Sequence, residues 1–505
     1  MPDRTLGIAA AILAAAGGCT LLTPLDDLQG TSGGAGGSAG ANGAGGDTGG
    51  VAGGGNGPPA GCEPPTGSAG EPNWAQRFGD SQVQQVRGVA TDSTCGVIVG
   101  GLLEGTIDFG DGNVLQSAGN ADVFVVRLDS RGSFVWGKSF GDADDQSIAD
   151  LVVDSFDRIV LAGSFAGTID FGDGPMTSAG AYDVFAVALQ AADGAPIWSW
   201  SMGGPDTEVG RGVAVDARGV AFVFGDYFGN FDSCTGPVVH HGGSNVEDIF
   251  VSKLNLSGAC ILTGTFGDNE SERAGDIAID SNGDILIAGD FRGSFNFGGA
   301  NLVAGSGVRD VFVARLDEDT NHIWSHRFGG GTTASRHEAG AIAVDASGSV
   351  FVAGGFSEGL DFGGTVDLTT TGTYDNWVAK LDGTTGLGTW AGTLGSSAFT
   401  KPALVPDARG GVFYASAFVG KAIFGGGEFT AIAMDSFAAH LSNADGEVEW
   451  LRVLTGDSDQ LANALASDAE GAILLGGSCV QAVNFGDGIE RCNAGEDGLL
   501  IKLAP

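Results

Sequence analysis

The sequence predicts an all-β fold, a seven-bladed β-propeller of four-stranded antiparallel blades whose last blade is completed by the N-terminal strand. Three observations support it: a glycine-rich composition, two aspartate marks that recur in phase, and the strand types found at the two chain ends. Of 505 residues, 91 are Gly and only 17% are charged, whereas an average globular protein has about 7% Gly and about 25% charged residues. This excess of glycine favours a repeat array.

Two aspartate marks recur seven times over residues 74–505 with a period of about 62 residues. The first mark opens a run of the form Asp-x-(Phe/Trp/Leu) and stands at Asp122, Asp183, Asp248, Asp310, Asp375, Asp435 and Asp497. The second closes an apolar run and stands at Asp92, Asp154, Asp216, Asp280, Asp345, Asp407 and Asp468. Because a residue present in every unit most economically serves the unit's fold, we interpret both sets as scaffold that binds turn amides.

Each unit contains four short apolar runs separated by turn signals, which is typical of an antiparallel meander. In the second unit these runs span residues 148–153, 159–165, 184–189 and 197–202. No window shows sustained helical periodicity, so the repeat region is predicted to contain strands alone.

The fourth run of each unit carries Trp-x-x-x-Phe or a related pair, as in Trp74 and Phe78. Residues i and i+4 of a strand share a face, so we expect both side chains to be core residues packed on a neighbouring sheet. A run of this fourth type precedes the first complete unit, whereas the last unit ends after its third run at Leu503. The N-terminal strand must therefore complete the last sheet, which closes the ring and protects its edges.

Residues 1–18 have the features of an export signal, because the apolar stretch from Leu6 to Gly18 is too short to span a bilayer. The segment from Ala14 to Thr20 resembles a bacterial lipoprotein signal, which implies cleavage before Cys19 and lipidation of that residue; a plain cut after the alanines is the alternative. Residues 19–73 are predicted to be a disordered tether, since 16 of residues 30–61 are Gly. We expect an exported protein, lipid-anchored to the outer membrane or cell surface, or secreted if it is not lipidated.

Four segments of the second unit and its borders, residues 136–141, 152–155, 162–174 and 178–185, resemble the SBBP-type β-propeller repeat family. The resemblance recurs in all seven units and covers about residues 74–505. It implies a propeller in an exported bacterial lipoprotein and carries no general catalytic motif.

The turn from Leu381 to Trp390 also resembles the docking turn of quinoprotein dehydrogenase propellers. A dehydrogenase is the weaker alternative, because those propellers usually have eight units and the sequence offers no quinone or metal ligands that can be placed.

Acidic loops are the most informative departure from the repeat. By meander connectivity, the loops between fourth and first runs and those between second and third runs emerge on one face of the ring. We interpret these carboxylates as a solvated acidic rim and predict no cofactor; a Ca²⁺ site is the alternative, because this ion takes six to eight oxygen ligands. The candidate ligand-face or calcium residues are Asp108, Asp111, Asp142, Asp144, Asp145, Asp170, Asp173, Asp268, Glu270, Asp457, Asp459 and Asp487.

Six cysteines remain beyond Cys19, and an even number in an exported chain predicts three disulfides. Of the fifteen possible pairings we expect Cys62–Cys95, Cys234–Cys260 and Cys479–Cys492, because each pair lies within or beside one sheet. In the third unit, residues 231–241 replace the usual loop and bring His240 and His241 near Cys234. We interpret this segment as a variable loop rather than a transition-metal site, since it lacks a paired-ligand spacing.

The formal charge of −39 argues against nucleic acid as a partner and against electrostatic membrane adsorption. The sequence therefore favours a monomeric, surface-tethered binding or scaffold module without catalysis, with an extracellular protein or glycan held on the acidic face or in the central channel. A carbohydrate-active lyase or hydrolase that uses loop carboxylates is the alternative. Close carboxylates with shifted pKa values in a channel pocket would favour the enzyme.

Overall fold

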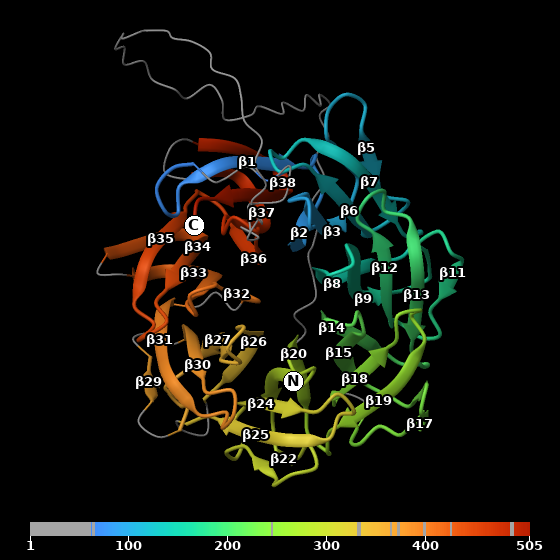
Figure 1. Ribbon diagram of the computed structural model, residues 1–505, viewed down its shortest axis with the longest axis vertical. Coiled ribbons are helices and arrows are strands. Elements are labelled where there is room, and N and C mark those ends of the chain that lie inside the picture. Colours follow the sequence, from blue (N-terminus) through green and yellow to red (C-terminus); the bar gives the residue numbers. More distant parts are fainter. Residues whose placement is uncertain are drawn as a thin grey trace, which may run out of the picture.

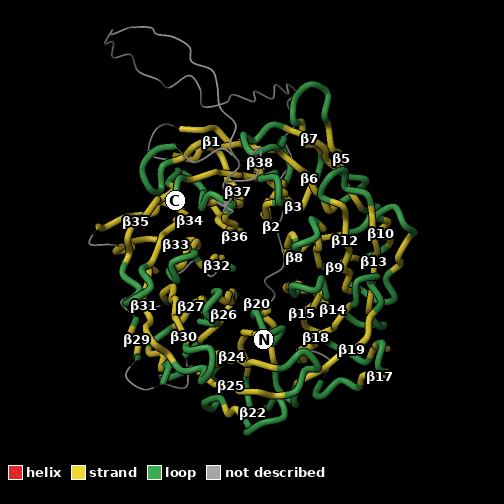
Figure 2. The backbone as a smooth tube through the Cα atoms, in the orientation of Figure 1, coloured by secondary structure: helices red, strands yellow, loops and turns green. Residues whose placement is uncertain are grey.

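The computed structural model describes Cys62 and residues 66–505, apart from 244–245, 331–334, 364–365, 371–373, 397–399, 425–426 and 485–488. Seven four-stranded antiparallel sheets form a closed ring around a central axis, which confirms the predicted seven-bladed propeller (Figure 1). All regular structure in the described residues is strand, as Figure 2 shows. Within this part of the chain, no helix has the length and apolar character needed to cross a bilayer.

The first strand of each blade lies nearest the axis of the ring and the fourth lies outermost (Figure 1). Blade 1 comprises β2 (Gln84–Thr91), β3 (Val97–Leu103), β6 (Asp122–Leu128) and β7 (Phe134–Phe140). Blade 2 comprises β8 (Gln146–Val153), β9 (Arg158–Phe165), β12 (Asp183–Gln190) and β13 (Pro196–Met202). Blade 3 comprises β14 (Glu208–Val215), β15 (Ala221–Tyr227), β18 (Asp248–Leu254) and β19 (Cys260–Phe266). Blade 4 comprises β20 (Glu272–Ile279), β21 (Ile285–Phe291), β24 (Asp310–Leu316) and β25 (His322–Phe328).

The remaining three blades follow the same order. Blade 5 comprises β26 (His337–Val344), β27 (Val350–Phe356), β30 (Asp375–Leu381) and β31 (Gly388–Ser396). Blade 6 comprises β32 (Ala403–Pro406), β33 (Val412–Phe424), β34 (Gly427–Leu441) and β35 (Val448–Leu454). Blade 7 comprises β36 (Gln460–Ser467), β37 (Ile473–Asn484), β38 (Ile489–Leu503) and β1 (Pro72–Phe78).

Small hairpins connect the second and third strands of blades 1–5. They are β4 (Thr106–Asp108) with β5 (Val114–Gln116), β10 (Thr168–Asp170) with β11 (Pro175–Thr177), β16 (Phe231–Ser233) with β17 (Gly236–Val238), β22 (Ser294–Phe295) with β23 (Leu302–Val303), and β28 (Gly359–Asp361) with β29 (Asp367–Thr369). We call the side of the ring that carries these hairpins and the loops between blades the loop face. The opposite side, with the turns after the first and third strands, is the turn face.

The ring is closed by the N-terminal strand, as predicted. β1 pairs antiparallel with β38, from Pro72 opposite Leu503 to Phe78 opposite Gly498. The strand begins two residues before the predicted start at Trp74. Residues ahead of it also join the blade, because Gly70 N–H donates to Ala504 O at 2.9 Å and Ala504 N–H donates to Glu71 O at 2.8 Å. The predicted signal peptide, Cys19 and most of the predicted tether lie outside the described residues.

Both aspartate sets act as scaffold. Each Asp of the second mark accepts hydrogen bonds from the amides two and four residues later, at 2.7–3.1 Å, in all seven blades. Asp122 and Asp183 accept from the amides of Ala118 and Ala179 in the loops that precede them. These contacts fix the turns and anchor the hairpin loops.

Contact between neighbouring blades rests on the tryptophan of the fourth strand. Trp324 and Phe328 of blade 4 lie in the core cluster that contains Val352 and Trp377 of blade 5, as the sequence predicts for this pair of side chains. The Trp324 indole N–H also donates to Gly383 O, 3.0 Å away in a turn of blade 5. The ring of each tryptophan faces a glycine in the next blade, the pairs being Trp74–Gly132, Trp136–Gly194, Trp198–Gly258, Trp324–Gly386, Trp390–Gly446 and Trp450–Gly70.

The interface between blades 3 and 4 is the one of the seven without a tryptophan–glycine pair, and it shows why the two residues occur together. Leu262 stands there in place of tryptophan, and Thr320 replaces the facing glycine. Thr320 instead contacts the position of Gly264, where an added Cβ would lie 2.8 Å from the Thr320 hydroxyl. A smaller side chain on one blade thus accompanies a larger one on the next.

Gly70 shows that residues before β1 supply the missing turn of blade 7. A Cβ at Gly70 would lie 2.9 Å from the Trp450 ring, and the residue has a φ of +76°. We predict that Gly70→Ala destabilises the protein more than Gly112→Ala, because Gly112 has a φ of +83° but open space around it. Both variants should lose about 1 kcal/mol to backbone strain, and Gly70→Ala about 1–3 kcal/mol more to displacement of Trp450. Thermal unfolding measures the difference, and equal losses would contradict the role of Gly70.

Candidate functional site

The acidic loops between blades use their carboxylates to hold the loops themselves. Asp142 accepts hydrogen bonds from the amides of Asp144 at 2.9 Å and Thr168 at 2.7 Å, and Asp268 accepts from those of Glu270 at 2.7 Å and Ser294 at 3.2 Å. The candidates Asp144, Glu270 and Asp457 are exposed. Asp459 accepts a hydrogen bond from the Met434 amide at 3.1 Å.

The hairpin carboxylates lie elsewhere. The hairpins leave the blades beside the interblade loops, as the contact between Thr168 and Asp142 shows, but they fold outward to the perimeter of the ring (Figure 1). Asp173 accepts a hydrogen bond from the Ser199 hydroxyl of the outermost strand β13 at 2.8 Å. Asp108 and Asp170 accept bonds from glycine amides of their own hairpins, and Asp111 is exposed. Asp487 lies outside the described residues.

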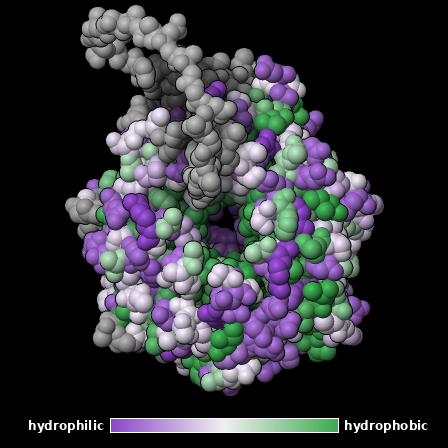
Figure 3. Space-filling model, in the orientation of Figure 1, coloured by the Kyte–Doolittle hydropathy of each residue, from purple (hydrophilic) through white to green (hydrophobic). Residues whose placement is uncertain are grey.

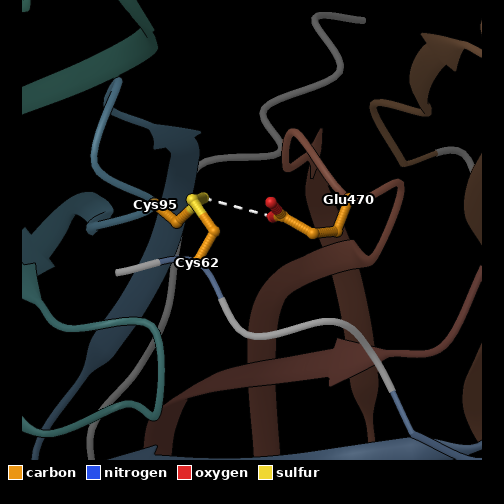
Figure 4. Close-up of side chains that lie close together, drawn as sticks. All are labelled: Cys62, Cys95 and Glu470. Carbon is orange, nitrogen blue, oxygen red and sulfur yellow. Dashed lines mark hydrogen bonds between the residues drawn. A yellow bond between two sulfur atoms is a disulfide. The ribbon is translucent and has the colours of Figure 1, made fainter. Parts of the chain in front are cut away.

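The predicted carboxylates therefore form no common cluster in the described residues. The one group of three potential metal ligands found there is Cys62, Cys95 and Glu470 on the turn face (Figure 4). Its two sulfurs are joined as a disulfide, and Glu470 Oε2 lies 3.2 Å from Cys95 Sγ. Burial, together with Asp468, raises the pKa of Glu470. We interpret this group as a covalent link with a neighbouring carboxyl group.

All three predicted disulfides are confirmed: Cys62–Cys95, Cys234–Cys260 and Cys479–Cys492. The first fastens the chain ahead of β1 to blade 1, and so spans the seam between blades 7 and 1. The second engages Cys234, so the loop that carries His240 and His241 has no free thiol beside them.

The innermost strands hold the features that sequence reasoning missed. In six blades this strand carries a bulge opposite the second strand, at Arg87, Ala149, Arg211, Gly275, Gly340 and Asn463. A bulge turns neighbouring side chains away from the regular alternation, and bulges are common beside active sites. Here they direct side chains toward the channel, whose hydrophilic opening is visible in Figure 3.

Asp150, Asp276 and Lys401 meet inside this channel from blades 2, 4 and 6. Lys401 Nζ lies 3.9 Å from Asp276 Oδ1 and donates to Arg211 O at 3.2 Å. Each carboxylate is held by an amide of the next blade, Asp150 by Val213 at 3.1 Å and Asp276 by Ile342 at 3.2 Å. Burial raises the pKa of both, that of Asp276 to about 6, with Lys401 opposing the rise.

The channel mouth at the loop face is lined on one side, in blades 3–5, by arginines on or beside the innermost strands. Arg211 Nε donates to Asp226 at 2.7 Å, Arg273 Nε to Glu247 at 3.0 Å, and Arg336 Nε to Glu338 at 2.6 Å. The carboxylate side chains are 0%, 12% and 6% exposed, whereas those of the arginines are 45%, 41% and 49% exposed, respectively.

A second layer supports these pairs from behind. The buried Arg309 guanidinium donates to Asp290, and the Tyr374 hydroxyl donates to Glu338 at 2.7 Å. Burial raises the pKa of Asp290 to about 6 despite Arg309. The arginines at the mouth are therefore oriented by a continuous network of hydrogen bonds and charges.

The opposite side of the mouth, in blades 7, 1 and 2, is predominantly acidic, and its one arginine among the described innermost strands, Arg87, interacts with Glu496 and donates to the Ser147 hydroxyl. The Tyr182 hydroxyl donates to Asp145 at 3.2 Å, and the Ser478 hydroxyl donates to Glu496 at 2.5 Å. Burial raises the pKa of Glu104, with smaller contributions from Asp145 and Glu496. Of the candidates predicted from the sequence, Asp145 is the one that belongs to this mouth.

The residue just before each third-strand aspartate marks the mouth in the sequence, because its identity varies between units. Scaffold positions are alike in every unit, but this position is occupied by Ala121, Tyr182, Glu247, Arg309, Tyr374, Met434 and Glu496. In three units it forms a parallel bridge to the next blade, close to the start of its first strand. A position that varies between units beside an invariant one could have located the site.

The side chain of the first residue of the innermost strand forms hydrogen bonds with the loops of the loop face. In blades 1, 2 and 7 it is Gln84, Gln146 and Gln460. Gln146 Oε1 accepts from the Asp142 amide at 3.2 Å, and its Nε2 donates to Ala166 O at 3.0 Å. In blade 4 the residue is Glu272, whose Oε2 accepts from the Asp268 amide at 3.0 Å. Its buried Oε1 makes no hydrogen bond to the described residues, so a protonated Glu272 would supply the donor that glutamine has there.

Burial raises the pKa of Glu272 from about 4.5 to about 9, with Asp268 adding to the shift. Between these values the folded chain keeps a proton that the unfolded chain releases, so stability falls as pH rises from about 4.5 to about 9. We predict that Glu272→Gln weakens this fall and raises stability at pH 8 by on the order of 1 kcal/mol. Gln146→Glu is the reciprocal control and should steepen the fall. Thermal unfolding between pH 5 and pH 9 measures both, and parallel pH profiles would contradict the protonation of Glu272.

The turn face contains a polar groove of about 460 Å³ between blades 4 and 5. Its lining includes Asp280, Asp284 and Arg315, and Arg315 donates to Asp284 at 3.0 Å and to Gly383 O at 2.7 Å. These contacts tie two turns together, so we assign the groove to the scaffold.

No family model matches this chain, and no curated protein matches it; its resemblance to SBBP-type repeats stays a prediction. Solved structures similar to the chain include a protein of unknown function from Bacteroides caccae, 10% identical over 70% of this chain and 92% of that one, with a TM-score of 0.34. Quinohemoprotein alcohol dehydrogenase from Comamonas testosteroni is 11% identical over 85% of this chain and 76% of the other, with a TM-score of 0.35. A europium-containing methanol dehydrogenase is 11% identical over 74% and 73%, with a TM-score of 0.39. At these scores the likenesses assign no function to this chain.

Proposed function

We propose that this protein is an exported, surface-tethered binding module that holds an extracellular ligand, a glycan or a protein, at the loop-face mouth of its central channel. The observation that carries the proposal is the convergence of charged side chains that individual blades do not share. Arg211, Arg273 and Arg336 stand on one side of the mouth, and Glu104 and Glu496 belong to the other.

Rigidity of the mouth supports binding. Each exposed arginine is held by a largely buried carboxylate, so little side-chain freedom is lost when a ligand binds. Because the groups come from neighbouring blades, their spacing is set by the closed ring rather than by a single loop. Such preorganised polar groups on a rigid frame are what specific recognition needs.

The course of the chain is consistent with a tether on the other side. Pro72 pairs with Leu503 at the turn-face end of blade 7, and Cys62 is bonded to Cys95 in a turn-face loop of blade 1. A tether that begins at a lipidated Cys19 would therefore reach the ring at the turn face. The loop-face mouth would then face away from the anchoring surface.

Glycan and peptide arrays probed with matched variants test this proposal. We predict that Glu104→Gln/Glu496→Gln changes the bound set or weakens binding about tenfold, whereas Asp170→Asn/Asp173→Asn at the perimeter leaves binding unchanged. The measurement is the affinity for each ligand captured by the unaltered protein. Binding that depends on the perimeter pair and ignores the mouth pair would contradict the proposal, as would no binding to any glycan or peptide.

A carbohydrate-active hydrolase or lyase is the second candidate, favoured by one observation. Asp150 and Asp276 are carboxylates with raised pKa values inside the channel, beside Lys401, and such groups are suited to proton transfer. This arrangement uses carboxylates of the innermost strands rather than the predicted loop carboxylates. If the protein is an enzyme of this class, Asp276→Asn should abolish release of new reducing ends from glycans, with binding retained. Turnover that is unchanged in Asp276→Asn, or absent in the unaltered protein, would contradict the catalytic role.

A further inference from the structure

We infer that the channel mouth recognises a carboxylate-bearing glycan, a uronate oligosaccharide, through Arg211, Arg273 and Arg336. This inference rests on the proposed binding function and names its ligand class. A guanidinium presents N–H donors in a planar fork that matches a carboxylate, which is why arginine is favoured where such groups are recognised.

The hydrogen-bond geometry leaves donors of two arginines available. Arg211 and Arg273 each use Nε, the donor nearest the chain, for the carboxylate behind them. Within the described residues their terminal amino groups make no hydrogen bond, and their side chains are 45% and 41% exposed. A ligand carboxylate in the mouth would meet donors that are already oriented.

These arginines contrast with two enclosed cations of the turn face. On the turn face, Lys502 is 5% exposed and Arg315 is 14% exposed, each paired with aspartates of the turns. Those cations are enclosed and serve the scaffold. The mouth arginines are paired with carboxylates of the blades, but their side chains remain partly exposed to solvent. They lie in a protein whose formal charge is −39.

Neighbouring carboxyl groups add less negative charge to this side than the sequence suggests. Burial raises the pKa of Glu208 to about 7 and that of Glu272 to about 9, with Asp183 and Asp268 as respective lesser causes. Glu272 is thus neutral at pH 7, and Glu208 is partly so. Both stand at the start of the innermost strands that carry Arg211 and Arg273.

The acidic side of the mouth favours a glycan over an acidic peptide. The side chains of Glu104, Asp145 and Glu496 have carboxylate oxygens that can accept hydrogen bonds, so sugar hydroxyls would donate to them while a carboxylate on the same chain reaches the arginines. A uronate chain carries both groups on each sugar. A run of acidic side chains on a peptide has the carboxylates but lacks the hydroxyl donors from which these three carboxylates would accept hydrogen bonds.

Calorimetric titration with trigalacturonate tests the inference, with its methyl ester as the uncharged control and triglutamate as the peptide control. We expect binding of the free acid, and binding of the ester and of triglutamate weaker by about tenfold or more. Arg273→Gln/Glu247→Gln removes both members of a pair and leaves no buried unpaired charge; it should weaken binding of the acid by about tenfold to a hundredfold. Arg409→Gln, at an arginine that is 77% exposed in a turn-face turn of blade 6, should leave it unchanged. Thermal unfolding confirms that each variant is folded.

The outcomes separate the ligand class from the binding function. Equal affinity for the acid and its ester, equal affinity for triglutamate, or equal losses in the two arginine variants would overturn the uronate assignment. If another glycan or a protein then binds and depends on Glu104 and Glu496, the proposed binding function stands without it. If nothing binds at the mouth, both fail.

Discussion

The tryptophan on the outermost strand of each blade, seated over a glycine of the next, is the contact on which the ring depends. A flat indole reaches across the interface only where the facing residue lacks a side chain, so the two positions must change together. The pair Leu262 and Thr320 shows this, because the interface without tryptophan is also the one without glycine. At the interface between blades 6 and 7 the facing glycine is Gly70, which precedes the first strand.

Closure of the ring determines what the channel can do. Seven innermost strands are held at fixed positions around the axis, so side chains from blades far apart in sequence meet there. Asp150 and Lys401 are separated by four blades along the chain and still interact through the channel. The scaffold therefore supplies rigid placement, and the residues that differ between blades supply the chemistry.

The fold was largely predictable from the sequence, whereas the site was not. Invariant marks such as Asp92 and Asp122 repeat because each blade needs the same turns, and repetition is visible without coordinates. The pairing of Cys62 with Cys95 followed from proximity to one sheet. The role of the acidic loops could not be predicted, because charge alone does not show that Asp142 accepts hydrogen bonds from loop amides. Arg211 and Asp276 were missed because their approach depends on bulges and ring closure, which the local sequence does not reveal.

Hydrogen–deuterium exchange of β38 tests ring closure most directly. Amides from Leu499 to Leu503 should be strongly protected in the full chain, because this strand lies between β37 and β1. In a chain that begins at residue 80, we expect exchange of this segment to accelerate more than exchange of the innermost strands of blades 3–5. Unchanged protection of Leu499–Leu503 without β1 would contradict it.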